Sequence, residues 1–262
     1  MMRILVITGG RINGNTQKMA GLIARRMETL AKADGVPFAY ETVNLLDCSL
    51  QFCRGCRVCF EKGEALCPCK DGLAALSAKM DTADGVLLSS PVYVEDVGGT
   101  VKNWIDRMAY HCYRPAFAGK LACVVTTSGV NATGHARRTM ATALRLWGYK
   151  LCGRRNFRTG ARMTEGEMLI RHAEAMDKTA RRFYHELKNG SALRPSVYSL
   201  IAFTVQQYSW RHRGEVSDVA LQYWKQKGWL DKGCRFYIPH RRNAVITGLA
   251  RAAGLVIARF FV

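Results

Sequence analysis

Short apolar runs rich in β-branched residues alternate along this chain with longer stretches in which apolar residues recur every three or four positions. The short runs predict five strands, at residues 3–8, 38–44, 85–90, 121–127 and 150–157. The longer stretches predict helices between and after them, at residues 16–33, 72–80, 99–110, 136–147 and 166–188. Strands that alternate with helices in this way are typical of a parallel sheet with crossover helices. The pattern therefore predicts a doubly wound α/β domain with five parallel strands.

The pattern changes after residue 189, where Asn189-Gly190-Ser191 is a turn signal. We therefore predict a first domain at residues 1–189, with a cysteine-rich insertion at 48–70 after the second strand, and a helical extension at 190–262. The extension contains eleven basic and three acidic residues, a net charge of +8, and many aromatic residues. This content of aromatic residues argues that the extension is ordered. We expect so short a segment to bury its own apolar surface poorly.

Overall composition narrows the class of protein. The 262 residues are 48% hydrophobic and carry a net charge of +19, which favours anionic ligands or partners. No nucleic-acid-binding motif is present, so we predict no nucleic-acid partner. The first ten residues, MMRILVITGG, contain no cleavage pattern of a secretory signal. With ten cysteines, this favours a reducing, cytoplasmic setting and the use of cysteine for metal or redox chemistry.

Four of these cysteines lie close together in the insertion. Cys53, Cys56, Cys59 and Cys67 have the spacing C-x2-C-x2-C-x7-C, which lets neighbouring thiolates converge on one metal centre. Three interpretations stay open: an iron–sulfur cluster, a cysteine-rich loop without metal and, less in keeping with the spacing, structural zinc. Cys69 is an alternative fourth ligand.

Small and hydroxyl-bearing residues follow three of the predicted strands. The candidate binding residues are Gly9, Gly10, Arg11, Asn13, Asn15 and Thr16 after the first strand, Pro91, Val92, Tyr93 and Val94 after the third, and Thr127, Ser128 and Gly129 after the fourth. A glycine-rich turn into a helix suits a phosphate, and Tyr93 offers a flat ring. Because the carboxyl ends of parallel strands lie at one edge, we expect a site there for a planar phosphorylated ligand. The glycine order G-G-x-x-x-G differs from the dinucleotide-binding G-x-G-x-x-G.

Taken together, these motifs resemble the flavodoxin-like NAD(P)H-dependent FMN reductase superfamily, especially its iron–sulfur flavoprotein branch. The first loop is similar to the family's G-S-P-R-x-N-G-N-T phosphate loop, with Gly9-Gly10 in place of the Ser-Pro pair. Ser90-Pro91-Val92-Tyr93, followed by Lys102 and Asp106-Arg107, resembles its S-P-V-Y…K…D-R segment. Thr126-Thr127-Ser128-Gly129 resembles the third flavin loop, and the cysteine run resembles the cluster motif.

The resemblance implies a flavodoxin-like fold with FMN as cofactor. It places the first loop around the FMN phosphate, Pro91–Val94 along the isoalloxazine ring and Thr127–Gly129 on its pyrimidine side. The glycine at position 9 removes a hydroxyl donor, so backbone N–H groups, Thr8 or another side chain are expected to compensate.

The activity implied is transfer of electrons from NAD(P)H through FMN to a small-molecule or protein acceptor. A 4Fe–4S cluster at the four cysteines is implied as a second carrier. The alternative is a non-enzymatic electron carrier that docks to a ferredoxin-like partner. The cofactor performs the redox chemistry, so no side chain is predicted as a catalytic acid, base or nucleophile.

The last predicted helix, residues 243–262, is almost wholly apolar apart from Thr247, Arg251 and Arg259. Its length would allow a membrane span, but a central arginine costs about 2.5–3.5 kcal/mol on insertion scales. We therefore expect a helix buried in a homodimer, with contact to a membrane surface as the second interpretation. In such a dimer the extension would help to wall the partner's flavin site.

Overall fold

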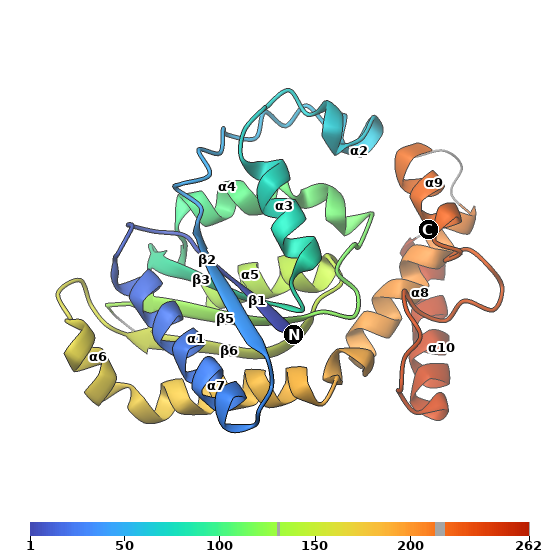
Figure 1. Cartoon of the computed structure of the whole chain (residues 1–262). Helices are drawn as coiled ribbons and strands as arrows, with labels where there is room; N and C mark the ends of the chain where they lie inside the picture. Colours follow the sequence, from blue (N-terminus) through green and yellow to red (C-terminus); the bar gives the residue numbers. More distant parts are fainter. Residues whose placement is uncertain (130–131, 213–217, 262) are drawn as a thin grey trace.

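The computed structural model describes residues 1–129, 132–212 and 218–261. Its centre is a parallel sheet with the strand order β2-β1-β3-β5-β6 (Figure 1). The strands are β1 (Met2–Thr8), β2 (Phe38–Asn44), β3 (Gly85–Tyr93), β5 (Leu121–Ser128) and β6 (Lys150–Arg158). All four neighbouring pairs are parallel. The predicted five-stranded, flavodoxin-like sheet is confirmed.

Helices cover both faces of this sheet (Figure 1). On one face, α1 (Asn15–Ala33) and α7 (Ala173–Lys188) bury their apolar residues against the strands. On the other lie α3 (Leu73–Thr82), α4 (Gly99–Arg107) and α5 (Gly134–Leu146). Each helix presents one apolar stripe, and the central strands are buried on both sides because a parallel sheet is covered on both faces.

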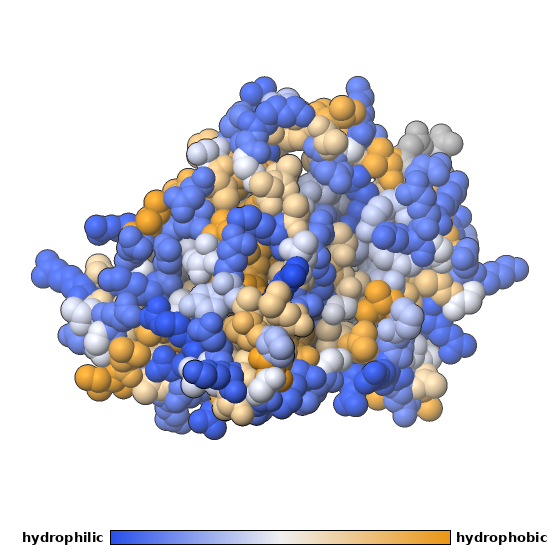
Figure 2. All heavy atoms as spheres, viewed as in Figure 1, coloured by the Kyte–Doolittle hydropathy of each residue, from blue (hydrophilic) through white to orange (hydrophobic). Residues whose placement is uncertain are grey.

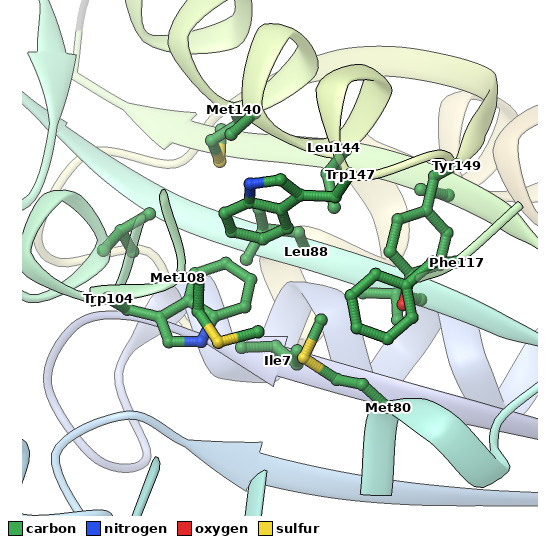
Figure 3. Close-up of a cluster of buried hydrophobic side chains, with 14 of the residues drawn as sticks. Ile7, Met80, Leu88, Trp104, Met108, Phe117, Met140, Leu144, Trp147 and Tyr149 are labelled. Carbon is green, nitrogen blue, oxygen red and sulfur yellow. The ribbon is translucent and has the colours of Figure 1, made fainter. Parts of the chain in front are cut away.

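Large aromatic side chains fix α4 and α5 to the sheet (Figure 3). Trp104 of α4 and Trp147, which follows α5, meet edge to face with ring centroids 5.1 Å apart. Phe117 and Tyr149 stack beside them at 4.8 Å. Fully buried aromatic pairs of this kind carry much of the energy of a core. Trp104 therefore fixes α4 firmly against the sheet.

The predicted helices agree with the structure to within about two residues, apart from two that differ more. The single helix predicted at 166–188 is two helices, α6 (Glu165–Arg171) and α7, because the chain turns at His172. The ring Nε2 of His172 lies 3.0 Å from the carbonyl oxygen of Arg158 at the end of β6, and this contact holds the turn. The helix predicted at 99–110 ends at Arg107 and continues as the 3-10 turn η2 (Ala109–Cys112).

The insertion and the extension lie outside this sandwich. The insertion contains the short helices α2 (Val58–Glu61) and η1 (Glu64–Leu66). The extension contains η3 (Ser191–Leu193), α8 (Val197–His212), α9 (Asp218–Gln226) and α10 (Ala244–Phe261). It lies on the opposite side of the molecule from α6 (Figure 1). Val262, the end of the last predicted helix, lies outside the described residues.

The extension has a hydrophobic cluster of its own, contrary to the expectation that it buries its apolar surface poorly. The buried members are Leu200, Phe203, Trp224, Trp229, Phe236 and Ala250. Large aromatic residues compensate for the shortness of the segment, since each removes a large apolar area from water. The cluster is tied to the first domain through Trp224, whose Nε1 donates to the carbonyl oxygen of Tyr113 at 2.7 Å. Within the described residues, none of the helices combines the length and hydrophobicity needed to cross a bilayer.

A short antiparallel strand, β4 (Asp96–Val97), pairs with the end of β3 and was not predicted. The turn between the two strands is formed by Val94 and Glu95, whose φ angles are +48° and +64°. Both lie in the left-handed region, as the type I′ hairpin turn requires. A β-branched residue is unfavourable there, and Val94 gains nothing from packing because it is 99% exposed.

Replacing Val94 by Asn should therefore stabilise the protein. We expect the Val94→Asn variant to gain about 1 kcal/mol in unfolding free energy, because asparagine tolerates the left-handed conformation. Urea unfolding followed by circular dichroism measures the gain. Val94→Thr, which keeps the β-branch, is the matched control and should show no gain. A destabilised Val94→Asn protein would contradict this account of the turn.

Candidate functional site

The carboxyl ends of β1, β3, β5 and β6 surround a cavity of about 690 Å³. This volume lies within the roughly 300–1,000 Å³ that is usual for small-molecule sites. Ten of the thirteen predicted binding residues line it: Arg11, Asn13, Asn15, Thr16, Pro91, Val92, Tyr93, Thr127, Ser128 and Gly129. The fold thus brings three segments, distant in the sequence, to one site.

The start of α1 forms the end of the cavity that is suited to an anion. The residue before the helix is Gly14, and no side chain caps the helix in the described structure. The first turn contains no acidic residue, while Arg11 and Lys18 line the cavity beside it. Free backbone N–H groups and the positive end of the helix dipole favour a phosphate. These residues fit the phosphate end of a flavin nucleotide.

Two hydrogen bonds hold the loops of the cavity together. The hydroxyl groups of Thr16 and Thr127 are 2.6 Å apart, and both residues are buried. The side-chain amide of Asn15 donates to the carbonyl oxygen of Gly160 at 3.0 Å. The first bond joins the start of α1 to the end of β5, and the second joins it to the segment after β6. The turn at the start of α1 is therefore held in place from two sides.

Pro91 and Tyr93 form an apolar wall of the cavity at the end of β3. The hydroxyl of Ser90 accepts a hydrogen bond from the backbone N–H of Gly98 at 3.0 Å, which ties this exit to the start of α4. Tyr93 is 63% exposed, so its ring is free to lie against a planar ligand. The chemistry of this wall fits an aromatic ring system.

Three predicted binding residues, Gly9, Gly10 and Val94, do not line the cavity. A Cβ atom on Gly9 would lie 2.0 Å from Cγ2 of Val101, and Gly10 has a φ of +151° and passes against Pro91. These glycines thus allow close packing behind the loop.

Thr8 was expected as one source of the missing hydroxyl donor. Its Oγ1 is buried with no hydrogen-bond partner among the described residues, and the residue is not part of the cavity lining.

The segment after β6 also lines the cavity and was not predicted. It contributes Thr159, Gly160, Ala161, Arg162, Met163 and Thr164. A signal was present, because this segment is small, hydroxyl-bearing and basic like the exit of β1. It also follows a strand that ends at the same edge of the sheet.

The cysteine-rich insertion lies beside α4. Cys53 and Cys56 are exposed, whereas Cys59 and Cys67 are partly buried. Burial raises the pKa of the Cys59 thiol, and the nearby thiols of Cys67, Cys53 and Cys56 raise it further. The four predicted ligands are therefore electrostatic neighbours. No set of three or more ligand side chains in the described residues is close enough to hold a metal ion.

A buried ion pair fastens the insertion to α4. Nη1 of Arg107 lies 2.6 Å from a carboxylate oxygen of Asp71, and both side chains are almost completely buried. The same guanidinium donates to the carbonyl oxygens of Gln51 and Cys69 at 2.8 and 3.2 Å. It also lies 4.0 Å from the sulfur of Cys67. Arg107 therefore connects both ends of the insertion to the helix.

Two further side chains complete this attachment. Asn103, one turn earlier on α4, accepts a hydrogen bond from the backbone N–H of Cys53 at 3.0 Å. Arg114 donates to the carbonyl oxygen of Cys59 at 2.6 Å and pairs with Glu64 at 2.9 Å. Polar side chains outside the insertion thus position its backbone on both sides of the cysteine run. A loop held in this way is suited to present its side chains to a ligand.

The charge of Asp71 depends on these contacts. Burial alone would raise the pKa of its carboxyl group, but hydrogen bonds from Arg107 and from the backbone N–H groups of Gln51 and Leu73 outweigh burial. The pKa of Asp71 is therefore lower than the ordinary value of 3.8.

Comparison with known proteins identifies the family of this chain. The model of the NADPH-dependent FMN reductase family matches residues 2–152. The chain belongs to this family. Family membership supports the coarse prediction of an FMN-dependent oxidoreductase.

Named relatives support the predicted branch of the family. An iron-sulfur flavoprotein of Archaeoglobus fulgidus is 24% identical over 231 residues, which are 88% of this chain and 100% of that protein. The iron-sulfur flavoprotein of Methanocaldococcus jannaschii is 35% identical over 107 residues, 40% of this chain and 51% of that protein. The predicted resemblance to the iron–sulfur flavoprotein branch is confirmed.

Solved structures agree with the fold. A flavone reductase has a TM-score of 0.52 at 17% identity, and the match covers 71% of this chain and 63% of that one. The apo form of the NADH:FMN oxidoreductase EMOB has a TM-score of 0.50 at 19% identity, covering 71% of this chain and 90% of that one. At this identity the likeness concerns the fold alone.

Breaking the buried ion pair should be costly. We expect Asp71→Ala to lower the unfolding free energy by about 3–5 kcal/mol near neutral pH, because it leaves the Arg107 charge buried without a partner. The matched control is Asp106→Ala, which removes an exposed ion pair with Lys102 of 2.7 Å and should cost about 0–1 kcal/mol. Equal losses in the two variants, measured by urea unfolding, would contradict the special role of the buried pair.

The stabilisation that Asp71 provides should also decrease as the pH is lowered. Because folding lowers the pKa of Asp71 below 3.8, its stabilisation is fully present above that value and is lost as the pH falls through the folded-state pKa. The difference between the wild type and Asp71→Ala should thus be constant near neutrality and shrink below about pH 4. Unfolding curves at several pH values test this, and a difference that grows on acidification would contradict it.

Proposed function

We propose that this protein binds FMN in the cavity at the carboxyl edge of the sheet and uses it to transfer electrons from NAD(P)H to a small-molecule or protein acceptor. The observation that carries the proposal is the pairing, in one cavity, of an uncapped helix start with a flat apolar wall. The cavity lies where the strand order reverses between β1 and β3, the position at which doubly wound folds bind their ligands.

Each part of the cavity has a separate role in this proposal. The N–H groups at the start of α1, with Arg11 and the side chains of Asn15 and Thr16, bind the phosphate. Pro91 and Tyr93 lie along the ring. Thr127, Ser128 and Gly129 lie at its pyrimidine edge, where hydroxyl and backbone groups can hydrogen-bond to a heterocycle.

The chain supplies position and electrostatics, not acid–base catalysis. Bound FMN supplies the capacity to accept a hydride and to pass electrons singly or in pairs. The basic residues at the cavity, Arg11, Lys18 and Arg162, attract the phosphates of both FMN and NAD(P)H. The rigid wall at Pro91 would orient the ring of bound FMN.

The cysteine insertion supports a second carrier. We infer that Cys53, Cys56, Cys59 and Cys67 hold a 4Fe–4S cluster, with zinc or no metal as the alternatives. In the described residues no three ligand side chains are close enough to hold a metal ion, so the loop would have to draw the four thiolates together around the cluster. The attachment of the loop through Asn103, Arg107 and Arg114 supports this inference, because it positions the backbone next to the ligands.

An electron carrier that docks to a ferredoxin-like protein is the second candidate function. It is favoured by the exposure of Cys53 and Cys56, which would leave a cluster accessible to a partner. Steady-state oxidation of NAD(P)H with an added acceptor separates this carrier from a reductase.

A homodimer is also part of the proposal. The ring site at Tyr93 is open to solvent, and a second subunit would exclude water from it. The extension lies on the side of the molecule opposite α6, whose first residue borders the cavity (Figure 1). It therefore lies far from the flavin cavity of its own chain, and any cover it provides would be for a partner's cavity.

The phosphate site is tested by removing its side chains. We expect Asn15→Ala and Thr16→Ala each to weaken FMN binding by about 1–3 kcal/mol, because a buried phosphate partner is left unpaired. Titration of apoprotein with FMN, followed by flavin fluorescence, measures the affinity. Thr16→Ser keeps the hydroxyl and should bind almost normally, and Ile12→Ala is the control in the same loop. Unchanged affinity in the Asn15/Thr16 double variant would refute the site.

The cluster is tested by metal analysis of anaerobically prepared protein. We expect the wild type to contain iron and acid-labile sulfide, and Cys56→Ser to lose both while keeping FMN, because the two sites use different residues. Cys48→Ser is the control outside the ligand set. Protein that contains FMN but neither iron nor sulfide after anaerobic reconstitution would show that the loop has another role.

A further inference from the structure

The helix α10 exposes its large apolar residues and buries its small ones. Val245, Leu249 and Phe260 are 69%, 67% and 82% exposed, and Val256 lies on the same face with more than half of its surface exposed. At 100° per residue these four positions share one side of the helix. A surface helix normally turns its large apolar residues toward the core, so α10 has an apolar face with no partner among the described residues.

The opposite face of α10 is made of small residues. Thr247, Ala250, Gly254 and Ala258 are buried, and a Cβ atom on Gly254 would lie 2.7 Å from Cβ of Thr204 on α8. The two helices therefore approach each other closely, and no space remains for larger side chains between them. A simple rotation of α10 could not bury its outer face in this protein.

Unpaired positive charge surrounds this apolar face. Arg241 and Arg242 directly precede α10, and the exposed Arg259 lies near its end. All ion pairs found in the described chain involve residues between 25 and 188, so none of the described basic residues of the extension is neutralised by one.

A basic cavity adds to this charge. Beside the first turn of α10 lies a cavity of about 560 Å³ whose charged lining residues are Lys227, Arg235 and Arg242, and no acidic residue lines it. Nε of Arg242 is buried without a hydrogen-bond partner in the described structure. The N–H groups of Val245 and Ile246 are already capped by Asn243, so the attraction for an anion comes from side chains.

We propose that α10 docks the protein on an anionic lipid surface, with Val245, Leu249, Val256 and Phe260 inserted at the boundary between headgroups and acyl chains. Its basic neighbours contact the headgroup phosphates. An apolar helix face bordered by arginines is the arrangement by which helices lie in the membrane interface, and each arginine near the surface adds to the affinity. The proposal does not depend on the flavin site.

Charge complementarity favours this partner over a second copy of the chain. Pairing of two α10 faces would bring together two extensions that each carry a net charge of +8. The three acidic residues of the extension are already included in this net charge, so repulsion would oppose the pairing. An anionic surface turns the same charge into attraction.

Vesicle flotation with the full-length protein tests the proposal. We expect binding to phosphatidylcholine vesicles that contain phosphatidylglycerol and little binding to pure phosphatidylcholine. The Leu249→Glu/Phe260→Glu variant should lose binding, because it places two acids on the inserted face. Phe52→Glu changes another strongly exposed aromatic residue, 82% exposed, and should bind normally. The Arg241→Gln/Arg242→Gln variant should bind roughly twenty-fivefold more weakly, since each arginine contributes roughly fivefold.

A second measurement reports insertion directly. A Phe260→Trp protein should show an added fluorescence signal that vesicles with brominated acyl chains quench, relative to the wild type. Failure of the wild type to bind the anionic vesicles would overturn the proposal, as would undiminished binding of the Leu249→Glu/Phe260→Glu variant. Sedimentation that shows a dimer for the wild type and a monomer for that variant would also overturn it, because the face would then belong to a second copy.

Discussion

The parallel pairing of the strands is the constraint on which both candidate sites depend. Because β1, β3, β5 and β6 run in the same direction, every strand exit lies at one edge, and the segments after them have to meet there. The exit of β3 has a second consequence, since it leads through the β4 hairpin directly into α4. The helix α4, which follows the wall formed by Pro91 and Tyr93, is also the helix that holds the cysteine insertion.

Hydrophilic side chains cover most of the face shown in Figure 2, as expected for a chain of net charge +19.

The sequence was sufficient for the parts of the structure that depend on local patterns. Strand positions and the three loops at the sheet edge follow from apolar periodicity and from glycine and hydroxyl residues, and the sheet agrees with that prediction. The pattern did not reveal contacts between distant residues. Arg107 belongs to a recognisable motif, but nothing in the sequence pairs it with Asp71, with which it forms a nearly solvent-free ion pair. The break at His172 likewise depends on a carbonyl of β6 that lies fourteen positions earlier.

The extension shows why size alone is a weak guide to order. It was expected to need a partner in order to bury its apolar residues, but its aromatic residues pack into a cluster around Phe203 and Trp224. The large apolar residues of α10 that remain exposed, Val245, Leu249, Val256 and Phe260, share one face of that helix. Because the extension lies on the side opposite α6 (Figure 1), attachment through α10 would keep the lipid surface away from the opening of the cavity at the sheet edge.

The contact between Gly9 and Val101 limits the routes by which this sequence can change. A serine at position 9, as in the family's phosphate loop, would place its Cβ atom 2.0 Å from the Val101 side chain, which is far inside the contact distance of two carbon atoms. Val101 is a fully buried residue of α4 in the core, so a shift of its side chain would disturb the packing around it. The two positions are therefore coupled by packing: a serine at position 9 requires a shifted or smaller side chain at position 101.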